Sequence, residues 1–525
     1  MILINSSPRN ALKIFQPFLP IFVPIGVGCL LASLHDEHIE AQFVDEQVDH
    51  NPLAKIEWYV KTAQKPCIFG FSVITAALNN AITLSKYLKE KYPGSIIIFG
   101  GIHPTAAPDE VMALPQVDYV MRGESERPLA EFYRCIKAGG DVTHIQNLSY
   151  RKHGAVFHNK IDAVPSHLEG APVFPYHLFD PKKYDLGFVL SSRGCPYNCI
   201  FCSNRVSTGK IYRYKAPLAV VDKLEKLNKK YGKTHILFID DNFLVNKERV
   251  YQTIEEIKRR GLHKKIVLNF QARADNVDRE ILTDLRSAGF GSIFFGIETA
   301  SEQTMKMLKK GETVAQCIDA VKLAKSIGFH VSATFLYGLP GDSFRRRMDC
   351  VRLTKALDLD MVRYNNATPY PGTELYEMAK REKRLHIVNN YENFNSVSTF
   401  IENPFNKIPL SYVPANNTEA EIRRDLLYSY FVFYLDLRKL KKIFANPEKG
   451  AAWFNAGESF VTFMRKVPAV ILLALMMSVK FLLLFHYIVI RKDTRISLSH
   501  FLTVFQGLHF WEHNPETELP GVAPQ

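Results

Sequence analysis

Short apolar segments alternate with longer amphipathic segments along the chain up to about residue 383. Apolar runs bounded by Gly, Pro, Asn or Asp are typical of strands, and apolar positions three and four residues apart are typical of helices. In the N-terminal third this alternation predicts a Rossmann-like, doubly wound parallel sheet. The expected strands are 1–5, 41–45, 68–72, 95–99 and 118–121, and the expected helices are 24–34, 79–91 and 127–137.

The same rhythm continues in the central part of the chain, where six strands alternate with helices. Six βα units predict a partial (βα)6 TIM-type barrel that is open on one side, with its chemistry at the carboxyl ends of the strands. The expected strands are 187–192, 235–240, 266–272, 292–297, 329–336 and 361–366, and the expected helices are 216–231, 247–261, 278–288, 314–327 and 345–356.

The βα rhythm is interrupted by a segment rich in proline and stops at about residue 384. We therefore expect a Rossmann-like domain over 1–145, a connector over 146–183, the partial barrel over 184–383 and a mostly helical region over 384–525. A helix is expected at 418–440, with acidic residues at its start and basic residues at its end, as the helix dipole favours.

Residues 467–490 are almost continuously apolar and long enough to span a bilayer. Lys480 lies near the middle, where a lysine costs about 3 kcal/mol. Three structures remain open for this segment: a membrane span, a helix lying in the head-group layer, and a pair of core helices that covers the open side of the barrel.

The composition is that of a globular protein, with 47% hydrophobic and 23% charged residues in 525. A net charge of +13 would suit nucleic acid or an anionic membrane surface. Because the basic residues are spread along the chain without a long Lys/Arg run, nucleic acid is the disfavoured partner.

Three of the eight cysteines, Cys195, Cys199 and Cys202, lie in one turn-like segment at C-x3-C-x2-C spacing. Three thiolates this close could hold three corners of an iron–sulfur cluster and leave the fourth iron open. A zinc site would normally use two C-x2-C pairs, and no second pair occurs. A disulfide cannot use three cysteines evenly, and no secretory signal precedes them. The other five cysteines are scattered singly, which favours buried thiols in a reducing cytoplasm.

This spacing, with the aromatic Phe201 before the third cysteine, resembles the signature of the radical S-adenosylmethionine (SAM) superfamily. The resemblance implies a [4Fe-4S] cluster held by Cys195, Cys199 and Cys202, with SAM on the open iron. It also implies reductive cleavage of SAM to a 5′-deoxyadenosyl radical. The electron would come from a protein such as flavodoxin or ferredoxin.

Polar residues follow each further strand of the expected barrel, where the SAM site would lie. Asp240 or Asp241 could hold the ammonium of SAM, and Arg273 could pair with its carboxylate in a charge-assisted fork. Glu298 could accept from ribose hydroxyls or from an ammonium, and Gly338 would let the backbone approach the adenine. Each residue could equally cap a helix or end a strand in solvent.

The strand ends of the N-terminal domain resemble the cobalamin-binding domain that precedes many radical SAM domains. They read F-G-F-S at 69–72, G-G-I-H-P-T at 100–105 and R-G-E-S-E at 122–126. The alternative is a Rossmann-like domain that keeps its glycines for packing only. The residues expected to contact cobalamin are Ser72, Thr75, Gly100, Gly101, His103, Gly123 and Glu124.

One departure concerns the ligand to cobalt. Family members that use a histidine carry D-x-H-x-x-G after the first strand, where this chain has Asn5-Ser6-Ser7-Pro8-Arg9-Asn10. Asp36-Glu37-His38 superficially resembles the motif but lacks the glycine and follows a helix, so we expect a solvated turn there. Cobalamin is therefore expected without a protein histidine ligand.

Together these features predict a cobalamin-dependent radical SAM enzyme that methylates an unactivated carbon of an apolar, lipid-like small molecule. Two alternatives remain open: an oxidative cyclase or other rearrangement without methyl transfer, and a non-catalytic corrinoid or cluster sensor. A radical SAM methylthiotransferase is disfavoured, because it would need a further N-terminal three-cysteine cluster and a basic RNA-binding tail, and the sequence has neither. We expect a cytoplasmic location, with membrane contact through 467–490, and we assign no catalytic residue.

Overall fold

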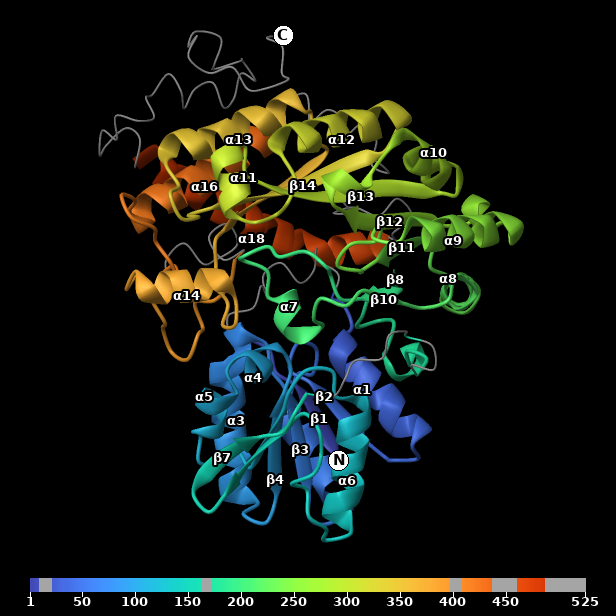
Figure 1. The fold of residues 1–525 in the computed structure, drawn as a ribbon, viewed down its shortest axis with the longest axis vertical. Helices are drawn as coiled ribbons and strands as arrows, with labels where there is room; N and C mark the ends of the chain where they lie inside the picture. The colour runs from blue at the N-terminus through green and yellow to red at the C-terminus, as the bar shows by residue number, and fades with distance from the viewer. Residues whose placement is uncertain (9–20, 162–167, 169–171, 397–407, 437–459, 487–525) are drawn as a thin grey trace.

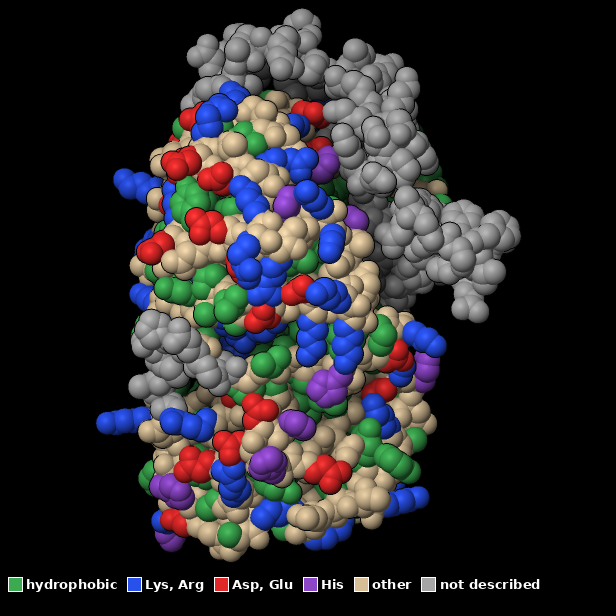
Figure 2. Space-filling model, turned by 90° about the vertical axis from the view of Figure 1, so that its right-hand side faces the viewer, with side chains coloured by type: hydrophobic (Ala, Val, Ile, Leu, Met, Phe, Trp, Pro, Cys, Tyr) green, Lys and Arg blue, Asp and Glu red, His purple; other side chains and the backbone are tan. Residues whose placement is uncertain are grey.

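The computed structural model describes residues 1–8, 21–161, 168, 172–396, 408–436 and 460–486. Figure 1 shows two lobes along the long axis of the molecule, with the N-terminal sheet at one end and the barrel strands with their helices at the other. The face in Figure 2 carries Lys and Arg interspersed with Asp and Glu. The spread of basic residues along the sequence is therefore also a spread over this surface.

The N-terminal lobe is the expected doubly wound sheet. Its five parallel strands lie in the order β2-β1-β3-β4-β5, which places the carboxyl ends of β1, β3, β4 and β5 along one edge. The elements are β1 (Ile2–Asn5), α1 (Ile25–Asp36), β2 (Gln42–Asp45), α2 (Pro52–Thr62), β3 (Ile68–Ser72), η2 (Thr75–Ala77), α3 (Leu78–Lys91), β4 (Ile96–Gly100), α4 (Ile102–Ala106), α5 (Pro108–Met112), β5 (Tyr119–Met121) and α6 (Glu126–Lys137).

The sheet continues beyond residue 145, where we expected a connector to begin. An antiparallel hairpin, β6 (Leu148–Lys152) and β7 (Ala155–His158), pairs with β5 and completes a seven-stranded sheet. The hairpin closes at His153 and Gly154, both with positive φ, so a tight turn brings the chain back on itself. The expected solvated turn at Asp36-Glu37-His38 is confirmed, because all three residues are exposed at the end of α1.

The second lobe contains six parallel strands in the order β15-β14-β13-β12-β11-β8, as the partial barrel requires. Phe238 stacks on Phe290, and Phe270 meets Phe290 edge to face, while Phe243 is tilted against Phe238 in the core of this lobe. The elements are β8 (Phe188–Val189), α8 (Pro217–Tyr231), β11 (His235–Phe238), α9 (Lys247–Arg259), η4 (Leu262–Lys264), β12 (Val267–Ala272), η5 (Ala274–Asn276), α10 (Arg279–Ser287), β13 (Phe290–Glu298), α11 (Glu302–Met307), α12 (Val314–Ile327), β14 (His330–Tyr337), α13 (Phe344–Ala356), β15 (Met361–Asn366) and α14 (Glu374–Arg381).

The first expected barrel strand, 187–192, divides in two. Only β8 pairs within the barrel, whereas β9 (Ser192–Arg193) leaves it and forms an antiparallel ribbon with β10 (Arg213–Tyr214). The side chain of Asp240 accepts hydrogen bonds from the backbone N–H groups of Ser191 and Ser192 at 2.7 and 2.9 Å. These bonds replace strand pairing at the break, so the chain leaves the barrel without unsatisfied amides.

Helices α16 (Glu419–Tyr434) and α18 (Phe460–Phe485) follow the barrel. Tyr430 and Tyr434 of α16 bond through their hydroxyls to the backbone of β15, the last strand of the open sheet. Phe481 of α18 packs edge to face on Phe431 of α16. Among the described residues, no helix combines the length and hydrophobicity needed to cross a bilayer. The basic end of the expected helix 418–440 and residues 487–490 lie outside the described residues.

Candidate functional site

The three cysteines lie on the long loop between β9 and β10, which emerges beyond the carboxyl end of β8. All three thiols are unpaired and half-buried. Burial raises the pKa of Cys195 and Cys199, and it raises the pKa of Cys202 to about 12. The positive charges of Arg273 and Lys310 oppose this effect and lower the pKa of Cys195 and Cys199. Two cations therefore face the cysteine loop.

Among the described residues, no group of three or more His, Cys, Asp or Glu side chains is close enough together to hold a metal ion. The donor set nevertheless fits the expected cluster, because one loop supplies three unpaired thiols and leaves one corner open. Ligation would draw the three thiols together and release their protons.

Asp240 and Asp241 follow β11 but occupy different surroundings. Asp240 is fully buried, bonds to the amides of Ser191 and Ser192, and lies 3.7 Å from Arg249. Asp241 lines a cavity beside the cysteine loop and accepts a hydrogen bond from Asn204 at 2.5 Å. Burial and the neighbouring Asp240 raise the pKa of Asp241 to about 6. Asp241 is therefore the more accessible of the two carboxylates proposed for the ammonium of SAM.

Arg273 stands at the end of β12 with its guanidinium carbon 3.5 Å from the ring centroid of Tyr197, a residue of the cysteine loop. Asp275 binds its Nε and Nη2 at 2.9 and 2.8 Å. The arginine is thus oriented toward the cysteine loop by an acid and an aromatic ring. A carboxylate ligand would have to share the guanidinium with Asp275.

Glu298 ends β13 in a left-handed conformation, with a φ of 70°. Its side chain is buried, and burial raises its pKa to about 7, against the opposing influence of Lys310. Lys310 is itself buried, pairs with Glu312 and donates to the carbonyl of Gly296. Sequence reasoning missed Lys310 and Glu312. Their only signal was a pair of charged residues just before α12.

Phe201 packs on an apolar cluster, and Gly338 directly precedes Leu339, a member of that cluster. Phe201 packs against a group that includes Ile200, Leu308 and Leu339. Gly338 has a φ of +78°, and a Cβ placed there would meet Ile422 of α16 at 3.3 Å. The glycine therefore admits both the left-handed turn and the close approach of α16. Its expected contact with adenine stays a prediction.

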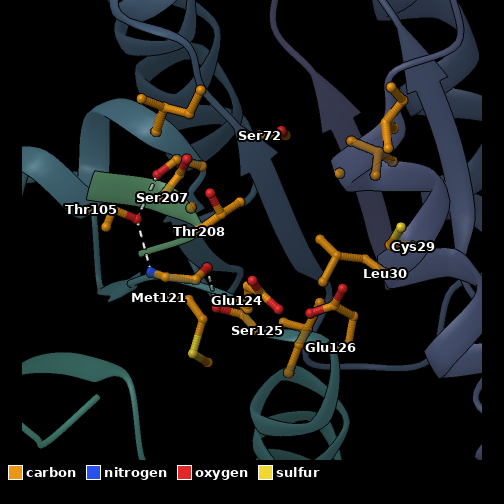
Figure 3. Close-up of a pocket in the computed structure, with 18 of the residues that line it drawn as sticks. Cys29, Leu30, Ser72, Thr105, Met121, Glu124, Ser125, Glu126, Ser207 and Thr208 are labelled. Carbon is orange, nitrogen blue, oxygen red and sulfur yellow. Dashed lines mark hydrogen bonds between the residues drawn. The ribbon is translucent and has the colours of Figure 1, made fainter. Parts of the chain in front are cut away.

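A cavity of about 300 Å³ lies between the carboxyl edge of the N-terminal sheet and the cysteine loop (Figure 3). This volume is within the usual range of ligand pockets. Five of the seven residues expected to contact cobalamin line it: Ser72, Gly100, Gly101, Gly123 and Glu124. The opposite wall comes from the barrel lobe and includes Ser192, Arg193, Ser207, Thr208 and Asp241.

Thr75 and His103 are not among the residues that line this cavity. Thr75 is buried at the start of η2. His103 is completely buried, and its ring centroid lies 4.9 Å from that of Tyr391. Burial lowers the pKa of His103 to about 4. The expected contact of these two residues with cobalamin has no support in their position, because both side chains pack within the protein.

Two glycines at the cavity have different surroundings. A Cβ on Gly101 would come within 2.9 Å of the backbone of Val73, so this glycine is needed for packing. Gly26 of α1 lines the cavity, and a Cβ there would meet nothing within 4 Å. Packing therefore accounts for Gly101, as the packing-only alternative expects, whereas Gly26 lies on α1, outside the strand-end motifs, and leaves open space in the cavity wall. The cavity, at the carboxyl edge of a doubly wound sheet, fits a bound cofactor.

Comparisons with known proteins agree with this geometry. The model of the radical SAM superfamily matches residues 189–354, and that of the B12 binding domain matches residues 16–133. An uncharacterized methyltransferase of Pyrococcus horikoshii is 30% identical over 80% of this chain and 89% of that protein. The anaerobic magnesium-protoporphyrin IX monomethyl ester cyclase of Cereibacter sphaeroides is 24% identical over 82% of this chain and 69% of its own length. The hopanoid C-3 methylase of Methylococcus capsulatus is 22% identical over 72% of this chain and 72% of its own length.

Solved structures share the fold. The cobalamin-dependent SAM radical enzyme OxsB, with aqua-cobalamin and SAM bound, has a TM-score of 0.65 at 17% identity over 96% of this chain and 83% of its own. The radical SAM methyltransferase TsrM of Kitasatospora setae, with cobalamin and a [4Fe-4S] cluster bound, has a TM-score of 0.58 at 18% identity over 72% of this chain and 74% of its own. The chain belongs to the radical SAM superfamily, in the branch with an N-terminal B12-binding domain.

Its cofactors are those of this branch: a [4Fe-4S] cluster, SAM and cobalamin. When bound, they supply one-electron chemistry, hydrogen abstraction and a methyl carrier. The chain contributes position and shelter. The β9–β10 ribbon presents the cysteine loop to the cavity, Arg273 and Lys310 add positive charge near the thiols, and the two lobes enclose the space between them.

Proposed function

We propose that this enzyme transfers a methyl group to an unactivated carbon of an apolar small molecule. The main support is the cavity between the lobes, which has the glycine-rich edge of the B12-binding domain on one side and the cysteine loop on the other. A methyl carrier and a radical source would therefore face the same space. The names of two relatives, a methyltransferase and a hopanoid C-3 methylase, support the same reaction.

The name of one relative, a hopanoid C-3 methylase, supports an apolar substrate. Leu3, Ile25, Val27, Leu30 and Leu129 also line the cavity. They belong to the lobe whose glycine-rich edge is expected to contact cobalamin, so they are not counted as contacts of the substrate. The substrate class we propose is a lipid-like molecule with little charge.

The test is anaerobic reconstitution with iron, sulfide and hydroxocobalamin, followed by incubation with dithionite, a lipid extract and SAM labelled with a deuterated methyl group. We expect 5′-deoxyadenosine and S-adenosylhomocysteine together, and a lipid heavier by one labelled methyl group. Cys199→Ala should abolish all three signals. A lipid fraction without label would contradict methyl transfer to this substrate class.

A cyclase-type oxidation is the second candidate, favoured by the 24% identity to the magnesium-protoporphyrin ester cyclase. It would yield 5′-deoxyadenosine without stoichiometric S-adenosylhomocysteine, so the same incubation separates the two reactions. A sensor would produce neither compound while still binding the cluster and corrinoid.

Within this site, we propose that Asp241 holds the ammonium of SAM and that Arg273 holds its carboxylate. The open position of Asp241 and the stacking of Arg273 on Tyr197 support these roles. Glu298, Phe201 and Gly338 complete the proposed SAM site, whereas the bonds of Asp240 favour a role in holding the loop. Asp241→Asn should raise the KM for SAM more than it lowers kcat, and an unchanged KM would argue against this contact.

We also propose a flavodoxin or ferredoxin as the reductant, since the reaction class needs one electron at a time. All eight cysteines are unpaired, which supports a reducing cytoplasmic location. Replacing dithionite by reduced flavodoxin should sustain 5′-deoxyadenosine formation. Failure with both flavodoxin and ferredoxin would remove this proposal.

Membrane contact through α18 is the last part of the proposal. Ile471, Leu475 and Leu482 are 55, 59 and 64% exposed and recur at helical spacing, while Leu484 on another side packs into the cluster with α16. An apolar stripe of this kind suits a lipid surface. The double change Leu475→Glu and Leu482→Glu should reduce flotation with anionic liposomes, whereas Trp58→Glu, at another exposed apolar residue, should not. Equal flotation of all three proteins would contradict contact through α18.

A further inference from the structure

The cysteine loop has a narrow base. Arg193 and Arg213 are paired residues of the β9–β10 ribbon, and the chain between them carries all three cluster cysteines. Arg193 stands two positions before Cys195. Any force that acts on this pair therefore acts on both ends of the cysteine loop.

Both arginines bind the same carboxylate of the other lobe. Arg193 Nη1 lies 2.7 Å and Arg213 Nη1 lies 3.0 Å from Glu124 Oε2, and Arg213 Nη2 also pairs with Glu124 Oε1. The second guanidinium nitrogen of Arg193 lies 2.7 Å from Glu126. Two acids of the B12-binding domain thus hold the base of the loop with charge-assisted bonds.

This cluster is shielded from water. The side chain of Arg213 is fully buried, and those of Arg193 and Glu124 are 14 and 20% exposed. Burial alone would raise the pKa of Glu124, but the bond to Arg213 and the two positive charges lower it. Removing one member would leave a buried charge without its partner, which is far more costly than losing a surface ion pair.

The segment 124–126, which carries the two acids, is itself held in the N-terminal lobe by hydrogen bonds. Asn147 donates to the carbonyl of Glu124 at 2.7 Å, the hydroxyl of Thr105 accepts from the amide of Gly123 at 2.9 Å, and Ser33 donates to the carbonyl of Glu126 at 3.0 Å. Figure 3 shows Glu124 and Glu126 at the cavity wall, with the bond between Thr105 and Gly123 drawn. A shift of the B12-binding domain would therefore move Glu124 and Glu126, and with them the two arginines that they bind.

We propose that Glu124, Arg193 and Arg213 form an interdomain clamp that couples the B12-binding domain to the geometry of the cluster loop. Glu124 is then a positioning residue that acts through the two arginines, and the clamp transmits occupancy of the cavity to the cysteines. This inference uses the family of the chain and the cofactors of its branch. It does not require that the reaction be methyl transfer.

The first test is tryptic cleavage of the folded protein with the cluster and corrinoid removed. Lys210 is an exposed cleavage site on the cysteine loop. Glu124→Gln should speed cleavage there at least ~10-fold, since it removes the charge from a buried ion-pair cluster. Glu131→Gln, in an exposed acid of α6, is the matched control and should cleave like the wild type. Equal rates in all three proteins would overturn the clamp.

The second test uses the reconstituted holoenzyme and its cluster spectrum. In the wild type, adding hydroxocobalamin should shift the electron paramagnetic resonance signal of the reduced cluster, and Glu124→Gln should lose that shift. Glu124→Asp, which keeps the charge, should restore part of it. A shift that persists in Glu124→Gln would overturn the coupling.

A double-mutant cycle separates the clamp from a direct contact between Glu124 and cobalamin. If the clamp operates, Arg193→Gln alone should reproduce part of the effects of Glu124→Gln, because Arg213 still pairs with Glu124, and the double variant should be little worse than Glu124→Gln. Additive effects would overturn the clamp, as would a loss of corrinoid affinity confined to Glu124→Gln. If either glutamine variant fails to fold, Arg193→Lys provides the same readouts, because it keeps the charge but loses the two-pronged contact.

Discussion

His103 illustrates how one side chain can belong to a sequence motif and still serve packing. It lies in the G-G-I-H-P-T segment, yet its ring is buried against Tyr391, and neither ring nitrogen has a hydrogen-bond partner among the described residues. A neutral imidazole tolerates this position better than a charged one. The histidine is therefore held in its uncharged form by the fold.

This burial predicts a pH dependence of stability. The unfolded chain protonates His103 below its ordinary pKa of 6.5, whereas the folded protein resists protonation down to about 4. Stability should therefore fall as the pH drops through this window, by about 3 kcal/mol from this residue. Measured by urea unfolding between pH 7 and 4, the free energy of unfolding should fall less steeply with pH in His103→Phe than in the wild type. His35→Phe, at an exposed histidine, is the control and should follow the wild type. Identical pH profiles of His103→Phe and the wild type would refute this role of His103.

At the scale of elements, α16 completes the open barrel. Its tyrosine hydroxyls bond to the backbone of β15, whose outer edge has no further strand partner among the described residues. Exposed strand edges invite unwanted pairing, and a covering helix is one way in which proteins protect them. Arg347 of α13 and Asp425 of α16 form a fully buried ion pair that fixes the helix there.

Removing one of these hydroxyls should therefore destabilise the second lobe. In Tyr430→Phe the backbone N–H of Tyr364 loses its acceptor at 3.1 Å in a buried position. We expect a loss of about 1–3 kcal/mol in the free energy of unfolding, measured by urea denaturation. Tyr87→Phe, at an exposed tyrosine, should change it little. An equal change in both variants would show that the bond to β15 has no special weight.

At the scale of the whole molecule, the two lobes meet around a cavity and through bonds between residues far apart in sequence. Tyr184 donates to Asp45 at 2.8 Å, and Tyr391 donates to Glu110 at 2.8 Å. A ligand that fills the space between the lobes should therefore stabilise both.

Hydroxocobalamin should raise the Tm of the protein, and Gly26→Trp should abolish this rise. Gly26 lies on the helix α1, lines the cavity and has open space where a Cβ would point, so a large side chain can enter without distorting the backbone. Differential scanning calorimetry with and without the corrinoid is the measurement. Gly94→Trp, at another glycine with open space around it, should keep the rise. A rise that survives in Gly26→Trp would place the corrinoid elsewhere.

The sequence by itself determined most of the strands and helices, the cysteine loop and the consecutive strand order of the partial barrel, but not the strand order of the N-terminal sheet. Periodicity and residue spacing are local properties, so β3, β15 and α12 begin and end where the pattern predicts. Tertiary structure alone decided which polar residues meet. Glu124 reaches Arg193 and Arg213 across 69 and 89 positions, and His103 is buried by a residue of the other lobe. Such pairings depend on how two folded lobes pack, which no local pattern records.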